Sequence, residues 1–280
     1  MTGAETGRPV DRRFAMGPAL LFAPADRPER YGKAAERSDA VILDLEDAVA
    51  PDAKAAAREH LANNPLDPAS TIVRINALST EDSRLDLAAL ARTSYRTIMV
   101  AKAEDPAAVA ALADFNVVAL CESAAGILAA PSLARLDNVV ALMWGAEDLV
   151  ASLGGTSSRH DDGSYRAVAM HARSSVLLAA GACGKTAIDS IYADIPDLEG
   201  LAAETADAVA SGFAVKACIH PNQVAVVRRA YRPSETEIAD ATELLAAADD
   251  AGTGVFAFKG QMVDGPILQH ARETLRRAAP

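Results

Sequence analysis

Two acidic residues, each close to the end of a short apolar run, have the spacing that most clearly suggests chemistry. The run VVALCES contains Glu122, and the run VVALMWGAED ends in Glu147 and Asp148. The intervening AAGILAAPSLARL is typical of a helix, and two strands joined by a helix run parallel and end at one edge of a sheet. We therefore expect Glu122 and Asp148 to lie side by side, where two carboxylates favour a hard divalent cation, above all Mg²⁺. The alternative is that each acid only caps the helix that follows.

A second acidic group follows an earlier apolar run. The segment DAVILDLEDAV contains Asp44, Glu46 and Asp47, and the next run, TIVRIN, carries Arg74 near its end. Carboxylates in such close contact repel one another, so the group indicates a metal shell, a cationic partner or acid–base chemistry. Arg74 could pair with these acids and present its guanidinium to a substrate carboxylate or a developing oxyanion. A purely structural ion pair is the competing interpretation.

Basic residues gather where the chain leaves another apolar run. Arg27, Arg30 and Lys33 surround a helix start near Pro28, which favours a phosphorylated ligand, although solvated surface charge would have the same pattern. Lys102 stands near the end of the run TIMVAKA. We expect it to face the same edge of the sheet.

The elements that must position these residues alternate regularly between strand and helix. Eight apolar runs typical of strands begin at Ala19, Ala40, Thr71, Thr97, Val117, Val139, Thr186 and Ala214. Eight such units in a chain of this size predict an α/β fold, a TIM (β/α)₈ barrel over residues 19–232. A doubly wound open sheet is the alternative, but no GxGxxG or Walker pattern supports it. We expect residues 1–18 to form an N-terminal arm and residues 233–280 a C-terminal helical extension, whose apolar face suggests contact with the barrel or a neighbouring subunit.

The amino-acid composition excludes some classes of binding partner. The formal net charge of −11 argues against nucleic acid and against an anionic membrane, so an anionic ligand must be held by local Arg and Lys residues. No apolar stretch reaches the length of a membrane span. Cys121, Cys183 and Cys218 lie in apolar runs without CxxC spacing. They are typical of buried, reduced thiols and predict a cytoplasmic protein.

An ordered series of motifs resembles one family. The segments LFAPADRPER, VILDLEDAV, VRIN, AKAE, CES, WGAEDL, CIHPNQ and GQMVDGP follow one another between Ala19 and Arg277. This order resembles the citrate lyase beta-subunit-like proteins of the HpcH/HpaI aldolase superfamily, relatives of malyl-CoA and citramalyl-CoA lyases. The resemblance implies a TIM barrel with an additional C-terminal segment, commonly assembled as a homotrimer. It also implies Mg²⁺ and an activity that cleaves or forms a carbon–carbon bond next to a coenzyme A thioester.

The resemblance also implies roles for individual residues. Glu122 and Asp148 would be the metal ligands, and Arg74 would contact the substrate near its reacting carbonyl. Asp44, Glu46 and Asp47 would be the acids that surround the metal and Arg74. Arg27 and Lys33 would lie near the CoA phosphates. Lys102 would take part in substrate binding. Asp264 matches an aspartate that is offered to an adjacent subunit's site as acid or base.

Several functions remain open at this point. The leading interpretation is a Mg²⁺-dependent lyase that converts a 3-hydroxyacyl-CoA, such as malyl-CoA or citramalyl-CoA, into acetyl-CoA and a 2-oxo acid. The alternatives are a malyl-CoA thioesterase, a citrate lyase beta subunit acting on an acyl-carrier-protein thioester, and a class II aldolase for free 2-oxo acids, for which His220 would be the strand-end histidine. A non-catalytic scaffold is disfavoured, because several buried charges without a function are costly.

Overall fold

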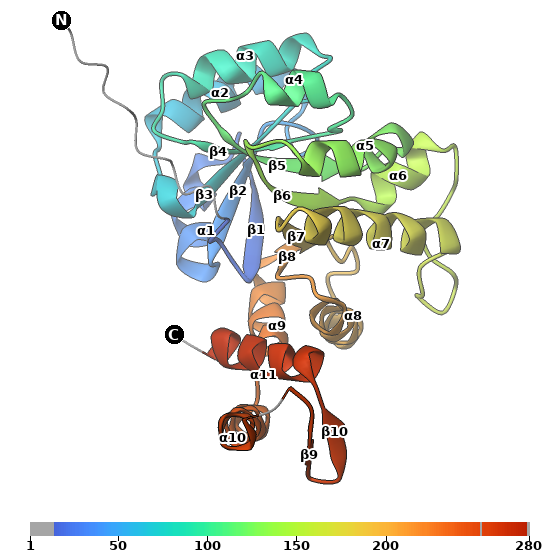
Figure 1. The fold of residues 1–280 in the computed structure, drawn as a ribbon. Helices are drawn as coiled ribbons and strands as arrows, with labels where there is room; N and C mark the ends of the chain where they lie inside the picture. The colour runs from blue at the N-terminus through green and yellow to red at the C-terminus, as the bar shows by residue number, and fades with distance from the viewer. Residues whose placement is uncertain (1–13, 253, 279–280) are drawn as a thin grey trace, which may run out of the picture. The chain divides into compact units, whose positions relative to one another are not determined.

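The computed structural model describes residues 14–252 and 254–278, and its core is a closed barrel of parallel strands (Figure 1). The strands are β1 (Ala19–Pro24), β2 (Ala40–Asp44), β3 (Thr71–Ile75), β4 (Thr97–Val100), β5 (Asn116–Cys121), β6 (Val139–Trp144), β7 (Thr186–Asp189) and β8 (Val215–Cys218). Each strand pairs with the next along the chain, and β8 pairs with β1. The predicted (β/α)₈ barrel is therefore confirmed, and the open sheet is wrong.

Helices surround the barrel because each strand is followed by a helical crossover (Figure 1). They are α1 (Tyr31–Arg37), α2 (Lys54–Asn63), α3 (Glu81–Leu90), α4 (Pro106–Ala110), α5 (Ala124–Ala134), α6 (Ala146–Ser152), α7 (Ala167–Ala182), α8 (Leu198–Ser211) and α9 (Pro221–Tyr231). Short 3₁₀ helices cover Pro28–Arg30, Pro51–Ala53 and Pro68–Ser70. Side-chain caps set several helix starts; Asp197, for example, accepts a hydrogen bond from the Gly200 amide at 2.8 Å.

The strands bury both faces, which explains why they are continuous apolar runs in the sequence. One set of alternating side chains fills the barrel, including Leu20, Ile42, Met99, Val118 and Ile188. The other set faces the helices, and there it includes charged residues that are treated below. All three cysteines are free of disulfides, but Cys183 is only half-buried, so the prediction that all three are buried is wrong for that residue.

The chain divides into two compact units, and the boundary between them in the sequence lies between Val227 and Arg228. The second unit contains α10 (Glu235–Ala251), the antiparallel strands β9 (Phe256–Phe258) and β10 (Gln261–Val263), and α11 (Gly265–Ala278). A reciprocal cap between Ser234 and Glu237 begins α10.

Two further predictions concern the chain's ends and its relation to membranes. The predicted arm over residues 1–18 lies outside the described residues as far as residue 13. Within the described ranges, none of the helices combines the length and apolar character that crossing a membrane would require.

Candidate metal and substrate site

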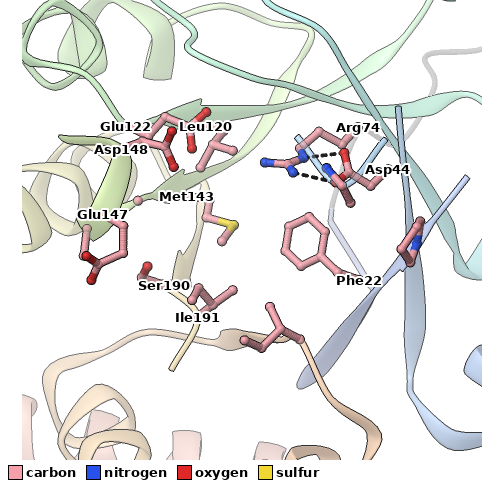
Figure 2. Close-up of a pocket in the computed structure, with 15 residues that line it drawn as sticks. Phe22, Asp44, Arg74, Leu120, Glu122, Met143, Glu147, Asp148, Ser190 and Ile191 are labelled. Carbon is pink, nitrogen blue, oxygen red and sulfur yellow. Dashed lines mark hydrogen bonds and ion pairs between the residues drawn. The ribbon is translucent and has the colours of Figure 1, made fainter. Parts of the chain in front are cut away.

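A pocket of about 280 Å³ opens where the barrel strands end (Figure 2). Its polar lining includes Asp44, Arg74, Glu122 and Asp148, and its apolar lining includes Phe22, Leu120, Met143, Ile191 and Ile219. These residues come from β1, β2, β3, β5 and β6 and from the segments after β5, β6, β7 and β8. The carboxyl ends of barrel strands are where TIM-barrel enzymes place their active sites.

Glu122 and Asp148 lie together at one side of this pocket (Figure 2). Glu122 directly follows β5 and is only 3% exposed, whereas Asp148 is half-buried in the first turn of α6. Burial, and then the nearby negative charge of Asp148, raise the pKa of Glu122 to about 8. The two carboxyl groups thus resist ionising together in this confined place, and a bound divalent cation would offset the repulsion between them.

The side chain of Glu122 does not cap the helix that follows it. Ser123, not Glu122, caps α5 by accepting a hydrogen bond from the Gly126 amide at 3.1 Å. Glu122 Oε1 instead accepts a hydrogen bond from the Lys102 amide at 3.0 Å. A β-carbon at Gly145 would lie 2.7 Å from the β-carbon of Glu122, so the WGAED segment needs glycine to pass this close. The capping interpretation is therefore wrong for Glu122.

Arg74 occupies the opposite side of the pocket (Figure 2). Its Nε and Nη2 donate to the two oxygens of Asp44 at 2.6 Å each, and its Nη1 lies 3.0 Å from Glu46 Oε2. Its guanidinium carbon lies 5.0 Å from the centre of the Phe22 ring. Burial disfavours the charged guanidinium, but the carboxylates of Asp44 and Glu46 outweigh burial and raise the pKa of Arg74. Arg74 is a fixed positive charge at the edge of the pocket.

Lys102 joins the two acidic groups. Its ammonium donates to Glu46 and lies 3.6 Å from Asp47 and from Asp148. The same ammonium lies 3.9 Å from Glu122 Oε1. Burial disfavours the ammonium, yet the hydrogen bond to Glu46 and the neighbouring carboxylates raise its pKa. Glu46 is buried and Asp47 is exposed, so the two acids that follow β2 have different surroundings.

Three other predicted site residues belong to other segments of the chain. Arg27 precedes the 3₁₀ helix Pro28–Arg30, has a side chain that is 55% exposed and lies 3.6 Å from Asp26. Lys33 is exposed on α1. Neither is among the described residues that line the pocket. Asp264 belongs to the second unit, where it directly precedes α11 and its carbonyl accepts a hydrogen bond from the Leu268 amide at 3.1 Å.

The carboxylates of Glu122 and Asp148 fit Mg²⁺ better than they fit a metal ion whose ligands all come from the protein. Within residues 14–252 and 254–278, no group of three or more His, Cys, Asp or Glu side chains is arranged to enclose an ion. Two converging carboxylates with a pocket beside them match the preference of Mg²⁺ for one or two protein carboxylates, with water and substrate as further ligands.

A buried ion network supports the pocket from behind. Asp189, the last residue of β7, accepts hydrogen bonds from Arg173 Nε at 3.0 Å and from Lys216 Nζ at 2.9 Å. Lys216 also donates to Glu204 at 3.0 Å and to the carbonyl of Ser190, a pocket residue, at 2.8 Å. The network was missed from the sequence, where Lys216 is an isolated charge within an apolar run. Ser190, Ile191 and Ile219 were missed because nothing in their residue types marks them.

Comparisons with known proteins agree with this geometry. Residues 19–221 match the family model described as HpcH/HpaI aldolase/citrate lyase. A citrate lyase subunit beta-like protein of Mycobacterium tuberculosis is 56% identical, and the alignment covers 94% of this chain and 96% of the relative. A solved structure of the CitE protein from the same organism, in complex with magnesium, acetoacetate and coenzyme A, superposes with a TM-score of 0.90 at 56% identity, covering 94% of this chain and 98% of that one.

More distant relatives have more specific names. The human mitochondrial citramalyl-CoA lyase is 31% identical over 93% of this chain and 85% of the relative. A (3S)-malyl-CoA thioesterase of Cereibacter sphaeroides is 36% identical over 93% of this chain and 94% of the relative. The resemblance derived from the ordered motifs is thereby confirmed.

Proposed function

The chain belongs to the HpcH/HpaI aldolase/citrate lyase family, and from this premise we propose that it is a Mg²⁺-dependent lyase acting on a 3-hydroxyacyl-CoA such as citramalyl-CoA or malyl-CoA. The products are acetyl-CoA and a 2-oxo acid. The observation that carries the proposal is the placement of Glu122 and Asp148 in the same pocket as Arg74. Magnesium in related structures and the names of the lyase relatives support it.

The reaction makes two demands on the site. The bond between the hydroxyl-bearing carbon and the carbon next to the thioester breaks, and its electron pair moves to the thioester as an enolate. The hydroxyl loses its proton to become the carbonyl of the 2-oxo acid, and the enolate carbon takes up a proton. The enzyme must therefore stabilise negative charge and move protons.

Glu122 and Asp148 would hold Mg²⁺, which when bound supplies positive charge to orient a 2-hydroxy carboxylate and make its hydroxyl more acidic. Arg74 stabilises negative charge that develops on the reacting oxygen, and the bidentate pair with Asp44 fixes the guanidinium for this purpose. The apolar wall formed by Leu120, Met143 and Ile191 limits access of water beside these charges.

The remaining roles extend the proposal beyond the pocket. Glu46 and Asp47 hold Lys102, which contributes to substrate binding. The exposed Arg27 and Lys33 are suited to the phosphates of CoA, a ligand present in a related structure. Asp264 acts as the acid or base toward the enolate carbon from an adjacent subunit of a homo-oligomer, a trimer.

The second candidate is thioester hydrolysis, favoured by the relative named as a (3S)-malyl-CoA thioesterase. The two outcomes differ in their products, because hydrolysis releases free CoA and the hydroxy acid instead of acetyl-CoA.

The deciding experiment is an assay of the purified protein with citramalyl-CoA and malyl-CoA, with and without Mg²⁺. Separate readouts follow acetyl-CoA, pyruvate or glyoxylate, and free CoA. Mg²⁺-dependent formation of acetyl-CoA that is lost in Asp148→Asn supports the lyase, and release of free CoA alone supports the thioesterase. Absence of turnover with either substrate, in protein that binds Mg²⁺, would contradict both.

A further inference from the structure

The ammonium of Lys102 lies among four carboxylates, two of which are the proposed metal ligands. It donates a hydrogen bond to Glu46 and lies 3.6 Å from Asp47. It also lies 3.6 Å from Asp148 and 3.9 Å from Glu122. The ammonium therefore attracts the carboxylates of Asp148 and Glu122 electrostatically but forms no hydrogen bond with them, since a hydrogen bond requires about 3.2 Å or less.

The backbone of Lys102 shows that this position is imposed by the fold. Its φ angle of 48° lies in the left-handed region, which is unusual for a residue with a side chain. In this conformation its amide donates to Glu122 Oε1 at 3.0 Å while its ammonium reaches Glu46. The same residue therefore orients one proposed metal ligand with its backbone and holds a positive charge near it with its side chain.

We propose that Lys102 is a tethered counter-ion that competes with the divalent cation for the carboxylates of Glu122 and Asp148. This inference rests on the proposed magnesium site. The cation and the ammonium are both positive and are attracted to the same two carboxylates, so the presence of one weakens the binding of the other. Glu46 and Asp47 keep the ammonium in the site when the cation takes the oxygens of Glu122 and Asp148.

The distances indicate the size of the effect. Mg²⁺ lies about 2.1 Å from a carboxylate oxygen, so an ion bound to Glu122 Oε1, itself 3.9 Å from the ammonium, lies no more than about 6 Å from that ammonium. Repulsion between a double and a single positive charge at about 6 Å corresponds to about a tenfold change in affinity, even with the dielectric constant of water. Removing the ammonium should therefore tighten Mg²⁺ binding about tenfold when the titration is made at a pH at which Glu122 is ionised.

The test is calorimetric titration of Mg²⁺ alone into the full-length protein, compared with Lys102→Met. This substitution removes the charge while keeping the backbone amide that holds Glu122. Lys102→Arg keeps the charge and should bind Mg²⁺ within about threefold of the unsubstituted protein. Lys185→Met is the matched control for loss of a lysine, because Lys185 directly precedes β7 at the opposite end of the barrel and donates to the Leu136 carbonyl at 3.2 Å.

The outcomes separate this inference from the proposed function. Tighter binding in Lys102→Met, but not in Lys185→Met, supports the competition. Unchanged or weaker binding in Lys102→Met overturns it, although the lyase proposal survives if the unsubstituted protein binds Mg²⁺. If only Lys102→Met binds Mg²⁺, the competition is supported in its strongest form. If neither binds, both the magnesium site and the competition are wrong.

A folding control keeps the test decisive. Lys102→Gln provides a second neutral side chain if Lys102→Met does not fold, and thermal unfolding with and without Mg²⁺ gives an independent readout. Competition predicts that the neutral variants gain a larger rise in Tm from Mg²⁺ than the unsubstituted protein does. An equal rise would overturn the inference.

Discussion

Arg74 is held by Asp44 through two parallel hydrogen bonds, each 2.6 Å long, at the end of two adjacent strands. The Asp44 carboxylate also accepts hydrogen bonds from the amides of Glu46 and Ala48, at 2.9 and 3.2 Å. Asp44 is thus fully engaged by the protein, and its part in the site is to orient the guanidinium. Asp44 is therefore a positioning acid, whereas Glu122 and Asp148 are the proposed metal ligands in the same pocket.

The first prediction concerns this pair. Asp44→Asn replaces one accepting oxygen with a donor, so one of the two parallel hydrogen bonds is lost and the guanidinium is no longer held in a single orientation. We expect kcat to fall about 10²-fold, in the range seen when one oxyanion-stabilising donor is lost. The apparent Kd for Mg²⁺ should change less than threefold. Steady-state kinetics and Mg²⁺ titration check this, and an equal loss in both quantities would contradict a role confined to Arg74.

The second prediction concerns the close approach of Gly145, directly after β6, to Glu122, directly after β5. Gly145→Ala adds a β-carbon 2.7 Å from that of Glu122, so the carboxylate must shift. Mg²⁺ binding should weaken about tenfold or more, as when a side chain that supports a metal ligand is altered. Gly181→Ala is the matched control, because nothing lies within 4 Å of the added atom and alanine favours a helix. Equal Mg²⁺ affinities in the two variants would rule out this packing constraint.

The sequence predicts the barrel well because parallel strands buried on both faces are continuous apolar runs. The predicted starts of β1 and β6, for example, coincide with Ala19 and Val139. The sequence also predicts that Glu122 and Asp148 lie close together, because parallel strands end at the same edge of the sheet.

Other parts of the site depend on geometry that residue order does not contain. Lys102 approaches acids that follow three other strands and does so with a left-handed backbone, a conformation that lysine does not favour. The buried position of Lys216 depends on partners from β7 and α8, and a single lysine within an apolar run does not identify them. The pocket residues Ser190 and Ile219 are ordinary residue types whose position follows only from how each strand ends.

The third prediction concerns thiol reactivity. Burial, and then the negative charge of Glu122, raise the pKa of Cys121 to about 12, so its thiolate is scarce at pH 8. The half-buried Cys183 should be alkylated by iodoacetamide first, and Cys121 should react only on unfolding. Peptide mapping by mass spectrometry after timed alkylation measures this order. Early labelling of Cys121 in folded protein would contradict the burial of the strand end that carries Glu122.

The fourth prediction concerns the buried charges behind the pocket. Lys216→Met leaves the buried Asp189 and the half-buried Glu204 without their shared ammonium, and loss of one partner from a buried ion pair costs about 3–5 kcal/mol of unfolding free energy. Lys259→Met is the control, because this exposed lysine pairs with Asp240 and Glu243 in the second unit and should cost no more than about 1 kcal/mol. Urea unfolding compares the two variants.

The same substitution should change the response to acid. Burial disfavours the Asp189 carboxylate, but Lys216 and Arg173 outweigh burial and lower its pKa in the folded state. A lowered pKa stabilises the fold above the unfolded value of about 3.9, and this contribution is lost as the pH falls through the folded pKa. Without Lys216 the folded pKa of Asp189 rises, so acid unfolding of Lys216→Met should begin at a higher pH. Circular dichroism during acid titration measures the midpoint, and coincident midpoints for Lys216→Met and the unsubstituted protein would show that Lys216 does not set the ionisation of Asp189.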